Sequence, residues 1–194
     1  MKNVELFLNH IEEVFGDNYQ IKRIESKDGG TPVHLFIYRD LPETGLMTFI
    51  TYGLSEVDHS EWINGKPELI LTLETSDLSW GYAIAGLVAE RRGIKRFSYG
   101  DLFTSDEPIS DDSEMVGFFV FSPSGLDKES QKIVTEGKPI FLAGMYPIYR
   151  EEVQLYNLIG LKEFWFTEGF ELYNPRRKNL ASMAAAKTAV ITSY

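Results

Sequence analysis

The chain contains no cysteine, which excludes disulfides, thiolate metal sites, iron–sulfur clusters and cysteine nucleophiles. It has only three histidines, His10, His34 and His59, and no two of them show the i, i+4 spacing of a helical metal site. The glycine-rich loops that bind phosphate and the G-x-S-x-G turn of hydrolases are also absent. The sequence therefore predicts no catalytic residue, no cofactor and no metal site.

Long apolar runs are missing as well. No run approaches the roughly 20 apolar residues of a membrane-spanning helix. The N-terminal residues alternate between charged and apolar types, unlike the apolar core of a signal peptide. We therefore expect a soluble, cytoplasmic protein that makes no contact with a membrane.

Basic residues are in the minority, with 19 lysines and arginines against 29 aspartates and glutamates and a net charge of −10. Such a surface repels the phosphate backbone of DNA and RNA, so we expect no nucleic-acid partner. It would attract a basic protein by long-range electrostatics. The same charge is also typical of the many proteins that are acidic for solubility alone.

The 194 residues, 43% of them hydrophobic, fit one domain, which we place at residues 1–178. Residues 179–194 are small and weakly patterned, and we expect a tail there that is either mobile or docked. Apolar periodicity predicts three main helices, over residues 3–16, 77–93 and 149–160, and a further helical turn over residues 161–166. β-prone runs predict strands over residues 20–26, 33–38, 46–53, 68–74, 115–121 and 139–148.

The predicted strands are clustered early and do not alternate regularly with helices. This order favours an α+β fold, with a mixed, mainly antiparallel sheet and helices packed on one side of it. The most distinctive part is residues 47–74, where two β-prone runs flank a loop that carries Asn64-Gly65. The first run ends in the corner Tyr52-Gly53-Leu54-Ser55.

Two polar loops are candidate sites. Asp58, His59 and Glu61 lie close together in sequence and offer possible metal ligands, although solvated surface loops often have this composition. The acidic segment 104–114 is a second candidate surface for a partner, and its alternative is a solvated excursion.

Over roughly residues 20–178 the chain resembles the suppressor of fused (SUFU-like) domain family. The blocks that carry the resemblance share the family's order and spacing: Thr51-Tyr52-Gly53-Leu54-Ser55, Glu68 to Leu73, Trp80 to Val88, Phe97-Ser98-Tyr99-Gly100-Asp101, Met115 to Pro123, Pro147 to Glu152, Gly160-Leu161 and Asn174-Pro175-Arg176-Arg177.

The resemblance implies a protein-binding domain without catalysis. Bacterial members look like immunity proteins, which neutralise a cognate toxin of a polymorphic toxin system. By the same resemblance, Phe97, Tyr99, Gly100 and Asp101 lie near the partner-binding surface. The Asp101 carboxylate then either pairs with a cationic side chain of the partner or only caps a turn after Gly100.

Two other functions remain open at this stage. One is an enzyme of an unrecognised kind, such as a metal-dependent hydrolase that uses Asp58, His59 and Glu61. The other is a housekeeping interaction scaffold with no connection to a toxin. The sequence leaves the partner, the binding face and the oligomeric state undetermined.

Overall fold

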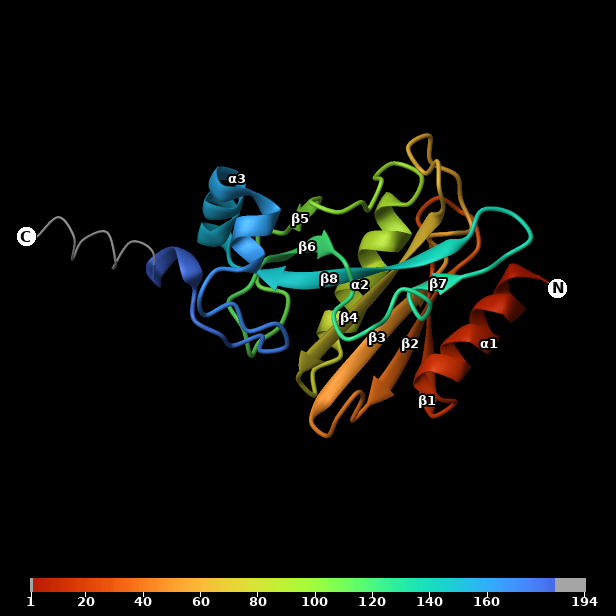
Figure 1. The fold of residues 1–194 in the computed structure, drawn as a ribbon, viewed down its shortest axis with the longest axis horizontal. Helices are drawn as coiled ribbons and strands as arrows, with labels where there is room; N and C mark the ends of the chain where they lie inside the picture. The colour runs from red at the N-terminus through yellow and green to blue at the C-terminus, as the bar shows by residue number, and fades with distance from the viewer. Residues whose placement is uncertain (1, 184–194) are drawn as a thin grey trace, which may run out of the picture.

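The computed structural model describes residues 2–183, and Figure 1 shows the arrangement of their helices and strands. The helices are α1 (Asn3–Phe15), α2 (Ser79–Arg91) and α3 (Arg150–Trp165). The strands are β1 (Tyr19–Ile24), β2 (Val33–Arg39), β3 (Leu46–Tyr52), β4 (Lys66–Glu74), β5 (Leu102–Thr104), β6 (Gly117–Phe121), β7 (Lys132–Ile133) and β8 (Ile140–Ile148).

All eight strands belong to one sheet with the order β1-β2-β3-β4-β8-β6-β5. Neighbouring strands are antiparallel except for β4 and β8, which pair in parallel from Lys66 opposite Ile140 to Ile70 opposite Gly144. On its other edge, β8 pairs first with β7 and then with β6. The predicted α+β class, with a mixed and mainly antiparallel sheet, is therefore confirmed.

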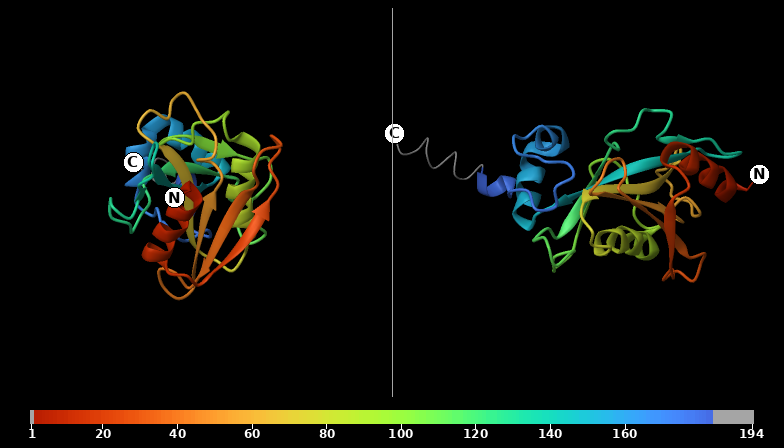
Figure 2. Two further views of the ribbon diagram at one scale, coloured as in Figure 1. Left: turned by 90° about the vertical axis from the view of Figure 1, so that its right-hand side faces the viewer. Right: turned by 90° about the horizontal axis from the view of Figure 1, so that it is seen from below.

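The helices cover both faces of the sheet, so the expectation of helices on one side was wrong. The right-hand view of Figure 2 shows α2 on one face and α1 and α3 on the other. All seven residues of β3 are buried, which requires cover on both sides. Phe49 packs in the cluster of α2, whereas Ile50 packs in the cluster of α1.

The predicted stop at Gly160 is a break within α3, and the predicted helical turn at 161–166 follows it. Gly160 has non-helical backbone angles, and the chain resumes helical turns as far as Trp165. Phe119 lies at the centre of the apolar cluster under α3, where it contacts the rings of Tyr156 and Phe164. The burial of this cluster explains why the helix resumes after the break.

The end of the chain returns to the sheet. The Glu74 amide at the end of β4 donates to the Tyr173 carbonyl (2.7 Å). Leu180 is buried in the cluster under α3. Of the tail expected at residues 179–194, residues 184–194 lie outside the described part of the chain. The domain boundary at residue 178 therefore stays a prediction.

None of the helices within residues 2–183 is both long and apolar enough to cross a membrane.

Candidate protein-binding surface

Residues 96–101 lie in the loop that joins α2 to β5, and they include all four residues expected near a partner. The Gly100 amide donates to the Val120 carbonyl, and the Val120 amide donates to the Asp101 carbonyl, each at 2.9 Å. The loop therefore extends the pairing with β6 before β5 begins. The Tyr156 hydroxyl on α3 also donates to the Gly100 carbonyl (3.2 Å), which fixes the loop from the other side.

Asp101 closes the turn of this loop. Its carboxylate accepts from the Ser98 amide (2.9 Å), and its own amide donates to the Ser98 carbonyl (2.9 Å). Arg96 forms an ion pair with the same carboxylate (2.8 Å). The side chain of Asp101 is only 17% exposed. The turn-capping interpretation thus describes this geometry, and direct pairing of Asp101 with a partner stays a prediction.

Phe97 and Tyr99 lie in different environments although they are two residues apart. Phe97 is buried and stacks on Phe103, with ring centroids 4.7 Å apart. Tyr99 is 52% exposed and its ring meets Phe121 edge-on at 5.5 Å. Of the four predicted residues, Tyr99 is the one that presents a large side chain to solvent, while Phe97 supports the loop from the core.

Beside Tyr99 lies a hollow of about 370 Å³, called the Tyr99 hollow below. Its walls come from four separate segments and include Trp62, Ile63, Arg96, Phe97, Tyr99 and Phe141. The Trp62 indole is buried and donates to the Arg96 carbonyl (2.6 Å). This hydrogen bond links the 61–66 loop to residues 96–101. Ile63 is 76% exposed at the edge.

Sequence reasoning missed Trp62, Ile63 and Phe141. Trp62 and Ile63 precede β4 and Phe141 lies on β8, all far from Tyr99 in sequence. The parallel pairing of β4 with β8 brings Phe141 next to the 62–63 segment. The one local signal was the apolar pair Trp62-Ile63 in an otherwise polar loop.

Asp58, His59 and Glu61 do not converge on a common point. Asp58 pairs with Lys66 (2.9 Å), and Lys66 lowers the pKa of the Asp58 carboxyl by a hydrogen bond. Glu61 pairs instead with Arg96 (3.2 Å), at the edge of the Tyr99 hollow. Within residues 2–183, no group of three or more histidine, aspartate or glutamate side chains is arranged to hold a metal ion.

The corner Tyr52-Gly53-Leu54-Ser55 is held by a buried carboxylate. Glu68 on β4 accepts hydrogen bonds from the Gly53 amide (2.7 Å), the Ser55 amide (2.9 Å) and the Ser55 hydroxyl (2.7 Å). The Thr51 hydroxyl donates to its other oxygen (2.7 Å). Burial raises the pKa of Glu68, and these four hydrogen bonds oppose that rise. Two of the recognised blocks, 51–55 and 68–73, therefore form one structural unit.

A second buried charged residue, Arg92, also fixes this corner. The Arg92 guanidinium, at the end of α2, donates to the Gly53 carbonyl (3.0 Å) and to both oxygens of Asp28 (2.8 Å each). The backbone at Gly53 has φ of +142°, and a Cβ there would lie 3.1 Å from the Val33 Cα. Glycine is therefore required at this corner for both its backbone angle and its lack of a side chain.

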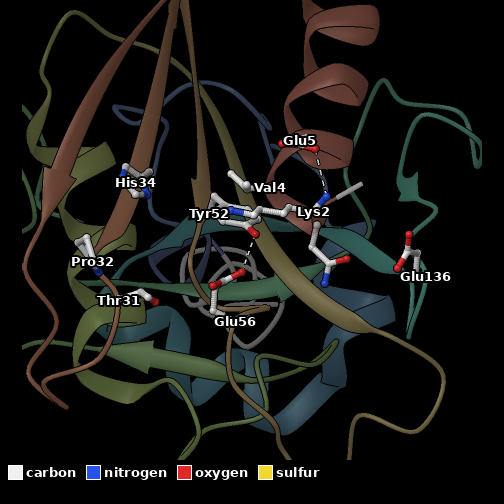
Figure 3. A pocket seen from close by; sticks show the side chains of 10 residues that line it. Lys2, Val4, Glu5, Thr31, Pro32, His34, Tyr52, Glu56 and Glu136 are labelled. Carbon is white, nitrogen blue, oxygen red and sulfur yellow. Dashed lines mark hydrogen bonds between the residues drawn. The ribbon is translucent and has the colours of Figure 1, made fainter.

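A larger hollow of about 920 Å³ opens beside the corner (Figure 3). Its lining includes the carboxylates of Glu5, Glu56 and Glu136, which give it an acidic wall. The Tyr52 hydroxyl donates to the Glu56 carboxylate. Burial, and to a lesser extent this hydrogen bond, raises the pKa of Tyr52 well above its ordinary value, so the phenol is neutral near neutral pH.

The acidic segment 104–114 is tied down at both ends. Arg150 donates to the Asp106 carbonyl (2.6 Å), and the Ser113 hydroxyl donates to the Pro175 carbonyl (2.6 Å). Arg176 pairs with Asp112 (3.3 Å). Ser110 is buried and donates to the Asp77 carboxylate just before α2. The segment is thus an ordered part of the surface, and its contact with a partner stays a prediction.

Comparisons with known proteins agree with this fold. No curated protein matches the chain. Among solved structures, a SUFU homolog from Neisseria gonorrhoeae FA 1090 is 14% identical, with a TM-score of 0.69 over 90% of this chain and 94% of that one. The Sufu–Fu complex gives 12% identity and a TM-score of 0.63 over 97% and 96%.

Drosophila Suppressor of Fused is also 12% identical, with a TM-score of 0.64. The match covers 98% of this chain but only 54% of the Drosophila chain, so the similarity spans about half of that protein. These structures share the fold of this chain. The family model for Suppressor of fused protein (SUFU) matches residues 29–178, and the chain therefore belongs to the SUFU family.

Proposed function

We propose that this chain is a non-catalytic protein-binding domain whose contact surface is centred on the Tyr99 hollow. The observation that supports this most strongly is the exposure of Tyr99 and Ile63 at the edges of a hollow lined by further aromatic side chains. Exposed aromatic and apolar side chains around a pocket are typical of the centre of a protein interface.

The charges around the hollow are suited to orienting a partner. Arg96 lies between Glu61 and Asp101 and pairs with both. A partner with a basic side chain would compete with Arg96 for these carboxylates, while the net charge of −10 would attract it from a distance. In the family, a solved structure of a Sufu–Fu complex is known, and this supports a protein as the partner here.

We further propose that the partner is a toxin domain and that the chain is an immunity protein that neutralises it. This step rests on the resemblance to bacterial members of the family. The acidic surface is consistent with capture of a basic toxin, since electrostatic attraction raises association rates.

The test begins with capture of partners by the tagged full chain from its native cells, followed by mass spectrometry. The captured protein is then produced alone and titrated with variants of the hollow. We expect Ile63→Asp and Tyr99→Ala each to raise Kd roughly tenfold or more, because both side chains lie at the centre of the proposed interface.

Ile94→Asp is the matched control, because Ile94 is 67% exposed and does not line the hollow. Equal losses for Ile63→Asp and Ile94→Asp would contradict the Tyr99 hollow as the site. If the captured protein is not toxic when expressed alone, the toxin connection fails and the housekeeping scaffold is favoured. If it is toxic and co-expression of this chain restores growth, the immunity function is supported.

A further inference from the structure

A second apolar depression lies along α2, away from the Tyr99 hollow. The residues Ala83, Gly86, Leu87 and Glu90 fall on one face of α2, because they follow the i, i+3, i+4, i+7 spacing of a helix. Together with Phe103 and the 105–109 segment they line a groove of about 390 Å³. This α2 groove shares no lining residue with the Tyr99 hollow.

The two depressions are lined by different parts of the chain around β5. The Tyr99 hollow takes residues 96–99 of the loop before β5, whereas the α2 groove takes Phe103 and Thr104 of β5 itself. The groove is lined by α2, and the right-hand view of Figure 2 shows α2 covering one face of the sheet.

Gly86 forms part of the floor of the α2 groove, and the fold itself gives no reason for a glycine there. Glycine is among the weakest helix formers, and position 86 is inside α2. A Cβ built on Gly86 would meet no atom within 4 Å, and its backbone angle is not restricted to glycine. By contrast, a Cβ on Gly81 of the same helix would lie 2.3 Å from the Phe49 ring.

Alanine at position 86 would therefore fit and would favour the helix. What glycine provides at this position is an unobstructed groove floor next to the side chains of Ala83 and Leu87.

The rim of the groove is acidic. Glu107 lines it, and neither Glu107 nor its neighbour Asp106 has an ion-pair partner within the described part of the chain. The whole segment 104–114 carries five acidic residues and no lysine or arginine. Glu90, on the opposite wall, already pairs with Lys27. Arg150 donates to the Asp106 carbonyl but pairs with neither the Asp106 nor the Glu107 carboxylate. An occupant with positive charge beside its apolar part would therefore complement this rim.

We propose that the α2 groove is a second docking site, which takes an apolar side chain from a basic segment of a protein partner, and that Gly86 keeps its floor open. An apolar floor of this volume accommodates a leucine- or phenylalanine-sized side chain. The unpaired acids at the rim would then pair with flanking lysines or arginines. This site is independent of the Tyr99 hollow and does not rest on the toxin connection.

The test is an NMR titration of the ¹⁵N-labelled full chain with the peptide acetyl-Lys-Arg-Leu-Arg-Lys-amide. We expect saturable shifts of the Gly86 and Gly117 amides, which belong to residues that line the groove. The matched acidic peptide, acetyl-Glu-Glu-Leu-Glu-Glu-amide, should produce none, because the rim repels it.

Two substitutions at position 86 distinguish docking from a general loss of structure. Gly86→Ala should raise the unfolding midpoint by about 2–4 °C and yet weaken peptide binding, because the helix gains and the floor rises. Gly86→Leu should fill the floor and raise the peptide Kd tenfold or more. Gly137→Leu is the control, since Gly137 is exposed, a Cβ there meets nothing within 4 Å, and it lies outside the groove.

Several results would overturn the proposal. These are no saturable shift at Gly86 and Gly117, equal shifts with the acidic peptide, or unchanged binding in both Gly86 variants. If the same amides shift with protein concentration in the absence of peptide, the occupant is a second copy of this chain and the basic partner segment is wrong.

Discussion

Glu152 on α3 and Arg177 near the end of the described chain form a fully buried ion pair. Arg177 donates to both oxygens of the Glu152 carboxylate, and the Leu180 amide donates to it as well (2.7 Å). The Arg177 guanidinium also lies over the Phe170 ring, 5.0 Å from its centroid. This pair joins two family blocks, 147–152 and 174–177, and holds the C-terminal segment against α3.

The first prediction concerns this ion pair. Glu152→Gln should lower the free energy of unfolding by about 3–5 kcal/mol, because it leaves the Arg177 charge buried without its partner. Glu151→Gln, at the exposed neighbouring position, should change it by less than about 0.5 kcal/mol. Urea unfolding of the full chain measures both.

A double substitution separates the pair from its surroundings. Glu152→Leu combined with Arg177→Met removes both buried charges, and we expect it to be much less destabilising than the sum of the single changes. Additive losses in the double variant would show that the packing around each side chain matters more than the ion pair.

The second prediction concerns Glu68 under the corner at Gly53. Glu68→Leu should lower the free energy of unfolding by about 2–6 kcal/mol, because the Gly53 and Ser55 amides would lose their acceptor in a buried place. Glu68→Gln should cost less, since its amide oxygen can still accept from both. Equal effects of the two substitutions in urea unfolding would contradict this role.

The third prediction concerns pH and Asp28. Hydrogen bonds from Arg92 lower the pKa of the Asp28 carboxyl well below its ordinary value. Because the unfolded chain binds this proton more readily, Asp28 stabilises the fold fully above its ordinary pKa near 4. This contribution is lost as the pH falls below about 4 towards the folded-state pKa.

Asp28→Asn should therefore lower stability at neutral pH and flatten the loss of stability between about pH 4 and pH 2. Asp111→Asn is the control at an exposed aspartate for which no ion pair is found in residues 2–183. Unfolding midpoints measured across this pH range decide the outcome. An unchanged acid limb in Asp28→Asn would assign the acid sensitivity to other carboxyl groups.

The fourth prediction separates the two roles considered for Asp101. Asp101→Ala should lower the free energy of unfolding by about 0.5–2 kcal/mol, because it removes the acceptor of the Ser98 amide that closes the turn. Asp101→Asn keeps an acceptor oxygen and loses only the half-exposed ion pair with Arg96, so we expect a cost below about 1 kcal/mol.

The asparagine variant is therefore the one suited to binding experiments. If Asp101 contacts a basic partner, Asp101→Asn should weaken binding while the fold remains intact. An unchanged Kd would leave Asp101 with the turn as its only role.

Much of the fold followed from local patterns. The strand of residues 33–38 was predicted because β-prone side chains follow one another there, and β2 extends only to Arg39. Local pattern could not reveal β5 or β7, which are three and two residues long and exist only through pairing with β6 and β8. Nor could it show that helices cover both faces, although β3, which carries no charged residue, was a signal.

The candidate site followed from sequence only in part. The resemblance directed attention to residues 97–101, but sequence does not distinguish the exposed Tyr99 from the buried Phe97. Which of two nearby aromatic residues faces solvent depends on the turn closed by Asp101 and on stacking with Phe103. Trp62 and Phe141 join the same hollow through contacts between distant segments, which no local pattern encodes.

The sequence by itself determined the class of this protein. The order of its β-prone runs, the absence of cysteine and of phosphate-binding loops, and the family blocks were all local properties of the chain. The tertiary structure decided what those blocks do. Glu68 holds the corner at Gly53, and Arg177 joins Glu152, because buried polar groups must find partners and those partners lie far away in sequence.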